Sequence, residues 1–358
     1  MARLAFAGLS RAGQALRRTA MLLAALLAVA APGQAGVPPC GGRDLIAEAP
    51  AARRAELQAR VAAVPYARGI LWQARRGDAR LILAGTYHFT DPRHAAVAGR
   101  LRPAIAHAAT LLVEAGPAEE RALERALRAD PTLMTDPDGP GLDRRLSPRD
   151  WQRLSAAMAA RGVPPKVSVR LRPWYLATML GVSPCMLRQA AAAEEGGLDH
   201  RLIAAAEAAG TPVRALEPWD TVFQVFAGLT PADQLDMLRA ALPEAERADD
   251  YARTMTEAYF AGDIWQLWEF GRLDAYDHSG LTRAEVDALT DLTRRQLMDN
   301  RNVAWIGPLT EAAEDAAKDG KPVVAAFGAL HLPGESGVLR LLQKDGWSVT
   351  PWTGDEPR

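Results

Sequence analysis

Residues 81–88 read Leu-Ile-Leu-Ala-Gly-Thr-Tyr-His, and residues 323–331 read Val-Val-Ala-Ala-Phe-Gly-Ala-Leu-His. Each stretch is a short apolar run, typical of a buried strand, that ends in Gly-x-x-His. In an open α/β sheet, functional side chains gather at the carboxyl ends of parallel strands, because loops and helix amino ends converge there. The repeated motif therefore predicts two strands that bring His88 and His331 to one edge of a sheet. Each glycine suits a point where the backbone comes close to a ligand or another strand.

Other short apolar runs predict the remaining strands of an α/β fold. Residues 69–74 and 79–84 form a predicted hairpin, because a turn sequence separates them. Further strands are expected at 111–113, 211–216 and 347–350. The segments between them have helical patterns, including all of 221–318.

Between the two Gly-x-x-His motifs, residues 149–318 predict a large, mainly helical insertion. The proline-rich segment 130–148 precedes it and is expected to be a long loop or a lid.

Composition excludes two broad classes of protein. The 358 residues are 49% apolar and 24% charged, which is ordinary for a globular chain and excludes wholesale disorder. Lys plus Arg number 42 and Asp plus Glu 43, and this balance does not indicate a nucleic-acid or polyanion partner.

The first 35 residues predict a signal peptide. Arginines precede an apolar run at Ala20–Ala31, and small residues precede a cut after Ala35. The run is too short to span a bilayer comfortably, although an uncleaved membrane anchor is the alternative. Residues 37–358 are then expected to form a single periplasmic or secreted domain without stable membrane insertion.

The only two cysteines, Cys40 and Cys185, remain after that cut. In an oxidising compartment the simplest prediction is a disulfide between them, and the alternative is two buried thiols. The sequence has no CxxC spacing, so we do not expect a cysteine-based metal site.

The predicted strand ends carry the candidate chemistry. Glu114 follows the run 111–113, and Glu217 follows the run 211–216. Two neutral histidines and a carboxylate form a normal ligand set for a divalent metal, so His88, Glu114 and His331 are the candidate ligands. Such a metal lowers the pKa of bound water and polarises a carbonyl.

Each candidate also has a structural interpretation. The histidines could satisfy core hydrogen bonds, Glu114 could pair with an arginine, and Glu217 could lie in an exposed turn. Arg301 could hold a carboxylate or an oxyanion, or it could lie on a helix surface.

Other ionisable residues are expected to be structural or on the surface, and several catalytic motifs are absent. The expected surface or structural residues are Asp199, His200 and His278, and His107 should face solvent. The sequence has no HExxH, GxSxG, GxGxxG or glycine-rich phosphate loop.

The runs 69–88 and 111–114, Arg301-Asn302 and the stretch 328–334 together resemble the TraB/GumN family, which is similar to the Tiki metalloproteases. The resemblance covers residues 44–349. It implies an α/β fold with a central mixed sheet built from two related halves and flanked by helices.

The same resemblance implies a metal site at the two motif histidines and Glu114, with the family arginine at Arg301. The Tiki branch implies metal-dependent hydrolysis of peptide bonds, with manganese or cobalt, and zinc also suits these ligands. Glu217 would be a base or a further ligand.

We therefore expect an exported metal-dependent hydrolase, with a peptide or small-molecule substrate and no nucleic-acid partner. The alternative is a non-catalytic envelope protein that binds a peptide or polysaccharide, and a third hypothesis is a purely structural envelope factor.

Overall fold

The computed structural model describes residues 40–193 and 196–354. The predicted signal peptide, residues 1–35, lies outside these ranges. The strands are β1 (Leu71–Arg76), β2 (Ala79–Thr86), β3 (Leu111–Val113), β4 (Val213–Ala215), β5 (Val323–Gly328) and β6 (Ser348–Pro351).

The helices are α2 (Ala51–Val61), α3 (His94–His107), α4 (Pro117–Ala129), α5 (Leu142–Arg145), α6 (Pro148–Ala160), α7 (Pro165–Ser168), α8 (Pro173–Leu180), α9 (Pro184–Ala192), α10 (Leu198–Ala209), α11 (Thr221–Ala227), α12 (Pro231–Glu246), α13 (Ala248–Ala261), α14 (Ile264–His278), α15 (Arg283–Arg294), α16 (Asn300–Ala317) and α17 (Val338–Lys344). Two 3₁₀ turns, Pro131–Leu133 and Ala329–His331, and a π-helical turn, Arg295–Asp299, complete the set.

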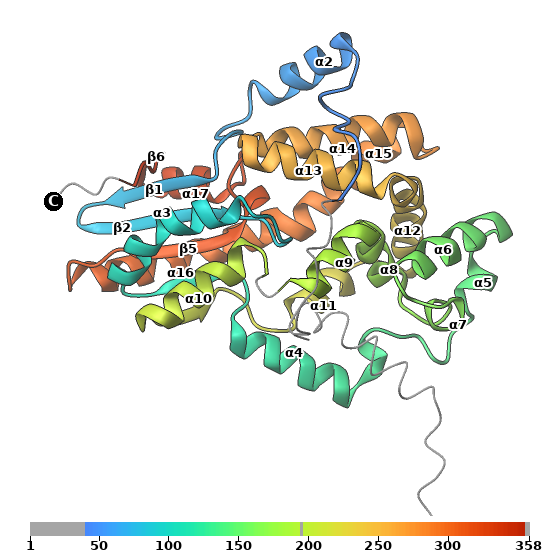
Figure 1. Ribbon diagram of the computed structural model, residues 1–358, viewed down its shortest axis with the longest axis horizontal. Coiled ribbons are helices and arrows are strands. Elements are labelled where there is room, and N and C mark those ends of the chain that lie inside the picture. Colours follow the sequence, from blue (N-terminus) through green and yellow to red (C-terminus); the bar gives the residue numbers. More distant parts are fainter. Residues whose placement is uncertain (1–39, 194–195, 355–358) are drawn as a thin grey trace, which may run out of the picture.

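The six strands form one mixed sheet in the order β4-β3-β5-β2-β1-β6 (Figure 1). β4, β3, β5 and β2 run parallel to one another. β1 is antiparallel to β2, and β6 is antiparallel to β1. All the predicted strands are present, and the expected hairpin is β1–β2. The α/β prediction with a mixed central sheet is confirmed.

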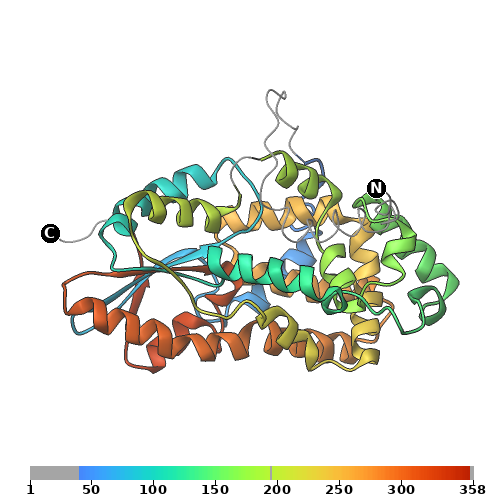
Figure 2. The ribbon, with the colours of Figure 1, turned by 90° about the horizontal axis from the view of Figure 1, so that it is seen from below.

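Helices cover both faces of the sheet (Figure 2). Alternate residues of a strand point to opposite faces, so Leu81 and Leu83 pack with α16 and α17, whereas Ile82 and Ala84 pack with α3 and α10. Apolar residues on both faces explain why the central strands read as continuous apolar runs. The helices on the two faces hold the four parallel strands between them, and the carboxyl ends of these strands lie along one edge of the sheet.

The segment between β4 and β5 consists of helices joined by short turns and has no strand among its residues, all of which the structure describes, as predicted for 221–318. Helices α6, α8, α11 and α12 share an apolar core separate from the two faces of the sheet. A smaller core joins α2 to α14. The part of the chain before β4 contributes to the same helical region, beside the sheet in Figure 1.

The prediction of a long loop or lid at 130–148 was wrong in part. The segment contains the turn Pro131–Leu133 and helix α5, whose first leucine is buried, and Thr135 forms a β-bridge with Leu171. Prolines in the sequence indicated a loop, but the apolar residues between them pack into the helical core.

Cys40 and Cys185 form the expected disulfide, across a sequence separation of 145 residues. It joins the first described residue to α9, next to the ion pair between Arg43 and Asp250 of α13. In the ranges that the structure describes, no helix is both long and apolar enough to cross a membrane.

Candidate functional site

Four neighbouring parallel strands carry the predicted site residues to one edge of the sheet. His88 follows β2, Glu114 follows β3, Glu217 follows β4, and His331 ends the turn after β5. The strand pairing therefore places all four at the carboxyl edge, where sites form in open α/β sheets.

Three of these side chains surround the Cα atom of Gly328. A methyl group placed there would lie 3.1 Å from Glu114 Oε1, 3.6 Å from His331 Cδ2 and 3.7 Å from His88 Nε2. His88 and His331 thus both lie near the same carboxylate, although 243 positions separate them in the sequence. The missing side chain at Gly328 leaves the space that they share.

Gly85, the glycine of the first motif, allows a close approach between two backbone segments. A Cβ atom on Gly85 would lie 2.7 Å from Leu332 Cδ1 and 3.0 Å from the Cα of Ala329. Gly85 therefore lets β2 pass close to the turn that carries His331, as the sequence predicted for a close backbone approach.

Arg301 is the cation at the centre of this edge. Its Nη2 donates to Glu114 Oε2 at 2.6 Å, while Nε and Nη2 donate to the two oxygens of Glu217 at 2.7 and 2.8 Å. Trp305 Nε1, one turn further along α16, also donates to Glu217 Oε1 at 2.9 Å. The side chains of Arg301 and Glu217 are 19% and 11% exposed, so neither is a surface group.

Glu114 is fully engaged in the structure. Besides Arg301, it accepts a hydrogen bond from the Gly328 amide on Oε1 at 2.5 Å. The arginine partner that the sequence analysis weighed for Glu114 is therefore present. Burial opposes ionisation, but His331, Arg301 and His88 outweigh it and lower the pKa of Glu114 to about 2.

His331 is held in a defined orientation by Asn302. The Asn302 side chain donates to the Ser336 carbonyl at 2.9 Å, so its oxygen faces His331 Nδ1, 2.6 Å away. Nδ1 then donates the proton, and the lone pair of Nε2 accepts a hydrogen bond from Arg301 Nη1 at 3.3 Å. Nε2 also lies 3.9 Å from Glu114 Oε1. Burial lowers the pKa of His331 to about 4, which keeps the ring neutral.

His88 has an equivalent support in Asp199. Asp199 Oδ2 lies 3.4 Å from His88 Nδ1 and 3.2 Å from His200 Nδ1, and Glu120 lies 3.5 Å from His200 Nε2. Desolvation opposes protonation of His88, but the Asp199 carboxylate outweighs it and moves the pKa above its usual value. The His88 side chain is still 58% exposed, so it is the accessible member of the site.

Asp199 and His200 were expected to be surface or structural residues, although Leu198-Asp199 also resembles positions of the family, and their contact with the site was not predicted. The reason is the position of α10, whose first turn docks on the end of β2 through a hydrogen bond from Leu198 N to Tyr87 O. The pair Gly196-Gly197 before this helix was the available signal, because Gly197 lies directly against the His88 backbone. The expectation that His107 faces solvent is confirmed.

The donor set fits a divalent first-row ion in its chemistry. Two imidazoles and one carboxylate meet beside Gly328, and each Nδ1 faces an oxygen acceptor, as in protein metal sites where such partners fix the ligand orientation. A bound ion would displace the proton that Asp199 stabilises on His88, because a histidine ligand must be neutral. Their spacing does not close on one ion, since within the described ranges no three His, Cys, Asp or Glu side chains gather tightly enough to hold a metal. Instead, the Arg301 side chain donates hydrogen bonds to both candidate ligands, from Nη2 to Glu114 Oε2 and from Nη1 to His331 Nε2.

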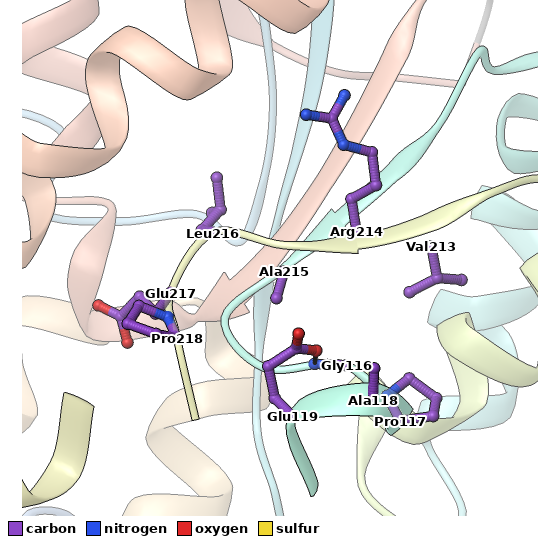
Figure 3. Close-up of a pocket in the computed structure, with 10 residues that line it drawn as sticks. All are labelled: Gly116, Pro117, Ala118, Glu119, Val213, Arg214, Ala215, Leu216, Glu217 and Pro218. Atoms are coloured by element: carbon purple, nitrogen blue, oxygen red, sulfur yellow. Dashed lines mark hydrogen bonds between the residues drawn. The ribbon is translucent and has the colours of Figure 1, made fainter. Parts of the chain in front are cut away.

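A pocket of about 500 Å³ lies beside this cluster (Figure 3). It is lined by the first turn of α4, at Gly116–Glu119, and by β4 with the residues that follow it, through Pro218. Glu119 accepts a hydrogen bond from the Gly116 amide, so its carboxylate caps α4. Glu217 belongs both to the pocket wall and to the Arg301 cluster.

The model of the TraB/PrgY/gumN family matches residues 70–351, a range that includes all four strand-end residues and Arg301. Comparison with curated proteins and with solved structures gave no significant match. Because the matched range covers most of the chain, the protein belongs to the TraB/PrgY/gumN family.

Proposed function

We propose that this member of the TraB/PrgY/gumN family is an exported metal-dependent hydrolase that cleaves peptide bonds. His88, Glu114 and His331 would hold a divalent ion, manganese, cobalt or zinc, after a side-chain adjustment that frees Glu114 from Arg301. The disulfide favours an oxidising compartment, which agrees with the signal peptide predicted from the sequence.

The observation that carries the proposal is the convergence of two oriented imidazoles and one carboxylate beside Gly328. A hydrogen-bonding role in the core would not require both rings and a carboxylate to meet at one backbone position. A half-exposed His88 beside a buried His331 also leaves one side of the pair open to a substrate.

The bound ion would activate water and polarise the scissile carbonyl. The residues of the chain have separate tasks. Asn302 and Asp199 keep the two rings in the orientation that presents Nε2. Glu217 holds Arg301 through two parallel hydrogen bonds, a rigid geometry suited to presenting the guanidinium to a substrate carboxylate or a developing oxyanion.

Glu217 is better placed to position Arg301 than to take a proton. Both of its oxygens accept hydrogen bonds, and one accepts from Trp305 as well. A general base must turn an oxygen toward the proton that it removes, whereas both oxygens of Glu217 are turned toward Arg301. We therefore propose the positioning role for Glu217 in place of the base or ligand role expected from the sequence.

A proteolysis assay tests this function. Purified protein, treated with EDTA and dialysed, is incubated with unfolded casein alone or with Mn²⁺, Co²⁺ or Zn²⁺, and products are identified by mass spectrometry. Cleavage should need one of these ions. It should fall at least about 100-fold in His88→Ala and in His331→Ala, because the ion supplies several kcal/mol of transition-state stabilisation.

His107→Ala is the matched control, since it removes an exposed histidine on α3 away from the strand ends. It should cleave like the wild type. Absence of cleavage with every ion, or equal cleavage by His88→Ala, would rule the proposal out.

A second candidate function is peptide binding without turnover. It is favoured by the ion pair between Arg301 and Glu114, which already supplies the carboxylate with a cation. In that case the protein would bind unfolded casein equally well with and without EDTA, and no ion would promote cleavage.

A further inference from the structure

The β4 end of the sheet is an open edge. β4 pairs with β3 on one side, and no strand in the described part of the chain pairs with its other side. Figure 2 views the molecule from this side, with β4 in front of the other strands and α4 starting beside it. An edge of this kind presents unpaired main-chain donors and acceptors.

The hydrogen-bond pattern identifies which groups face outward. Leu111 N donates to Pro212 O, and Leu216 N donates to Val113 O, so the even-numbered residues of this stretch are directed toward β3. Main-chain groups of successive residues in a strand point to opposite sides. The N–H and C=O groups of Val213 and Ala215 therefore point away from the sheet.

These outward groups lie along the pocket of about 500 Å³. Val213 and Ala215 line it, and their side chains point toward the first turn of α4 (Figure 3). Glu217, two residues beyond the strand, continues the same wall and holds Arg301. The open edge thus leads directly from solvent to the candidate site.

We propose that an extended peptide segment binds along the outer side of β4 as an added parallel or antiparallel strand, with its backbone passing Glu217 toward Arg301 and His88. Main-chain hydrogen bonds to Val213 and Ala215 hold the segment, and the pocket takes a side chain that points toward α4. Recognition through the backbone makes the site tolerant of peptide sequence. Cleavage of the bound segment rests on the proposed function, whereas binding does not.

The test uses two variants at one position. Ala215→Pro removes the outward N–H and leaves the bonds to β3 intact, and proline is tolerated at such edge positions. Ala215→Val adds similar bulk to the pocket and keeps the N–H, so it is the matched control. Far-ultraviolet circular dichroism and a thermal melt check the fold of both.

The probe is a short fluorescein-labelled peptide of Thr, Val and Lys, and its binding is measured by fluorescence anisotropy in EDTA so that no cleavage occurs. A second probe has the same sequence with a methyl group on every backbone nitrogen, so that neither edge of the extended peptide can donate a hydrogen bond. Ala215→Pro loses one main-chain hydrogen bond, so it should bind the first probe about fivefold more weakly than Ala215→Val does. The methylated probe loses several such bonds, so the wild type should bind it at least about tenfold more weakly than the first probe. Ala215→Val adds similar bulk at the same position and keeps the outward N–H, so the loss caused by proline is measured against this variant.

Unchanged binding of the methylated probe to the wild type overturns the proposal, and so does failure of the wild type to bind the first probe. The methylated probe decides the matter by itself if Ala215→Pro does not fold. Peptide binding with this pattern and no proteolysis under any metal would leave the inference standing and remove the proposed hydrolase. Metal-dependent proteolysis, together with equal binding of the methylated and unmethylated probes, would support the proposed hydrolase and overturn the inference about β4.

Discussion

Asn302 has a side chain whose two polar ends are both used. It lies only 1% exposed, between the His331 ring and the Ser336 carbonyl. Its neighbour Arg301 forms the central ion pairs of the site, so one turn of α16 determines both the ring orientation and the charge balance. The π-helical turn just before α16 is a feature often found next to functional sites.

Asn302→Ala should destabilise the protein by about 2 kcal/mol, because a buried N–H and a buried carbonyl lose their partners. It should also weaken metal binding or activity by about 10- to 100-fold, since the orientation of His331 is no longer fixed. Urea unfolding and metal titration measure the two effects.

Asn300→Ala is the control, because Asn300 is exposed and begins the same helix. It should change neither property appreciably. An Asn302→Ala protein that loses stability but keeps full metal affinity would contradict the positioning role.

The residues of the repeated motif could be located from the sequence, whereas their supporting partners could not. An apolar run followed by Gly-x-x-His is a local signal, and it placed His88 and His331 at strand ends. Asp199 and Asn302 reach these rings because of how α10 and α16 pack on the sheet, and no local pattern encodes that packing. The Arg301–Glu217 pair depends on the same long-range packing.

At the scale of elements, the amino end of α10 is fitted closely against the end of β2. A Cβ atom on Gly197 would lie 2.4 Å from both the carbonyl carbon and the oxygen of His88. These are backbone atoms, so the conflict cannot be relieved by rotating a side chain. The helix therefore needs glycine here if Asp199 is to reach His88.

Gly197→Ala should destabilise the protein by about 1–3 kcal/mol through overpacking, and it should reduce any activity that depends on His88. Gly99→Ala is the matched control, because an added Cβ there meets nothing within 4 Å on an exposed position of α3. That change should stabilise α3 by up to about 1 kcal/mol. Equal unfolding midpoints for the two variants would contradict the close contact between α10 and β2.

Strands and helices differ in how well their patterns could be interpreted. The buried strands were predictable because both faces are apolar, and β4 was found although it has only three residues. The prediction of a long loop or lid at 130–148 was wrong in part, because proline indicates turns but also begins helices and 3₁₀ turns, as at Pro131. Packing against the helical core decides between these outcomes.

Across the whole molecule, the disulfide connects two distant parts of the chain. Cys40 precedes α2, which packs on α14, and Cys185 lies in α9 of the helical region. The bond therefore fixes the start of the described chain to the body of the protein. Its long loop makes the entropic effect on the unfolded state large.

Replacing both cysteines by serine should lower the free energy of unfolding by up to about 5 kcal/mol. Urea unfolding of this double variant against the wild type measures the loss. Intact mass after alkylation, with and without prior reduction, counts the cysteines that were paired. Two alkylated thiols in the unreduced native protein would contradict the bond.

The central claim is that His88, Glu114 and His331 form one metal site. Equilibrium dialysis against Mn²⁺, Co²⁺ or Zn²⁺, followed by elemental analysis, tests it most directly. We expect one bound ion per chain in the wild type and in His107→Ala, and loss of that ion in both His88→Ala and His331→Ala. A wild type that binds none of these ions, or histidine variants that retain the ion, would contradict it.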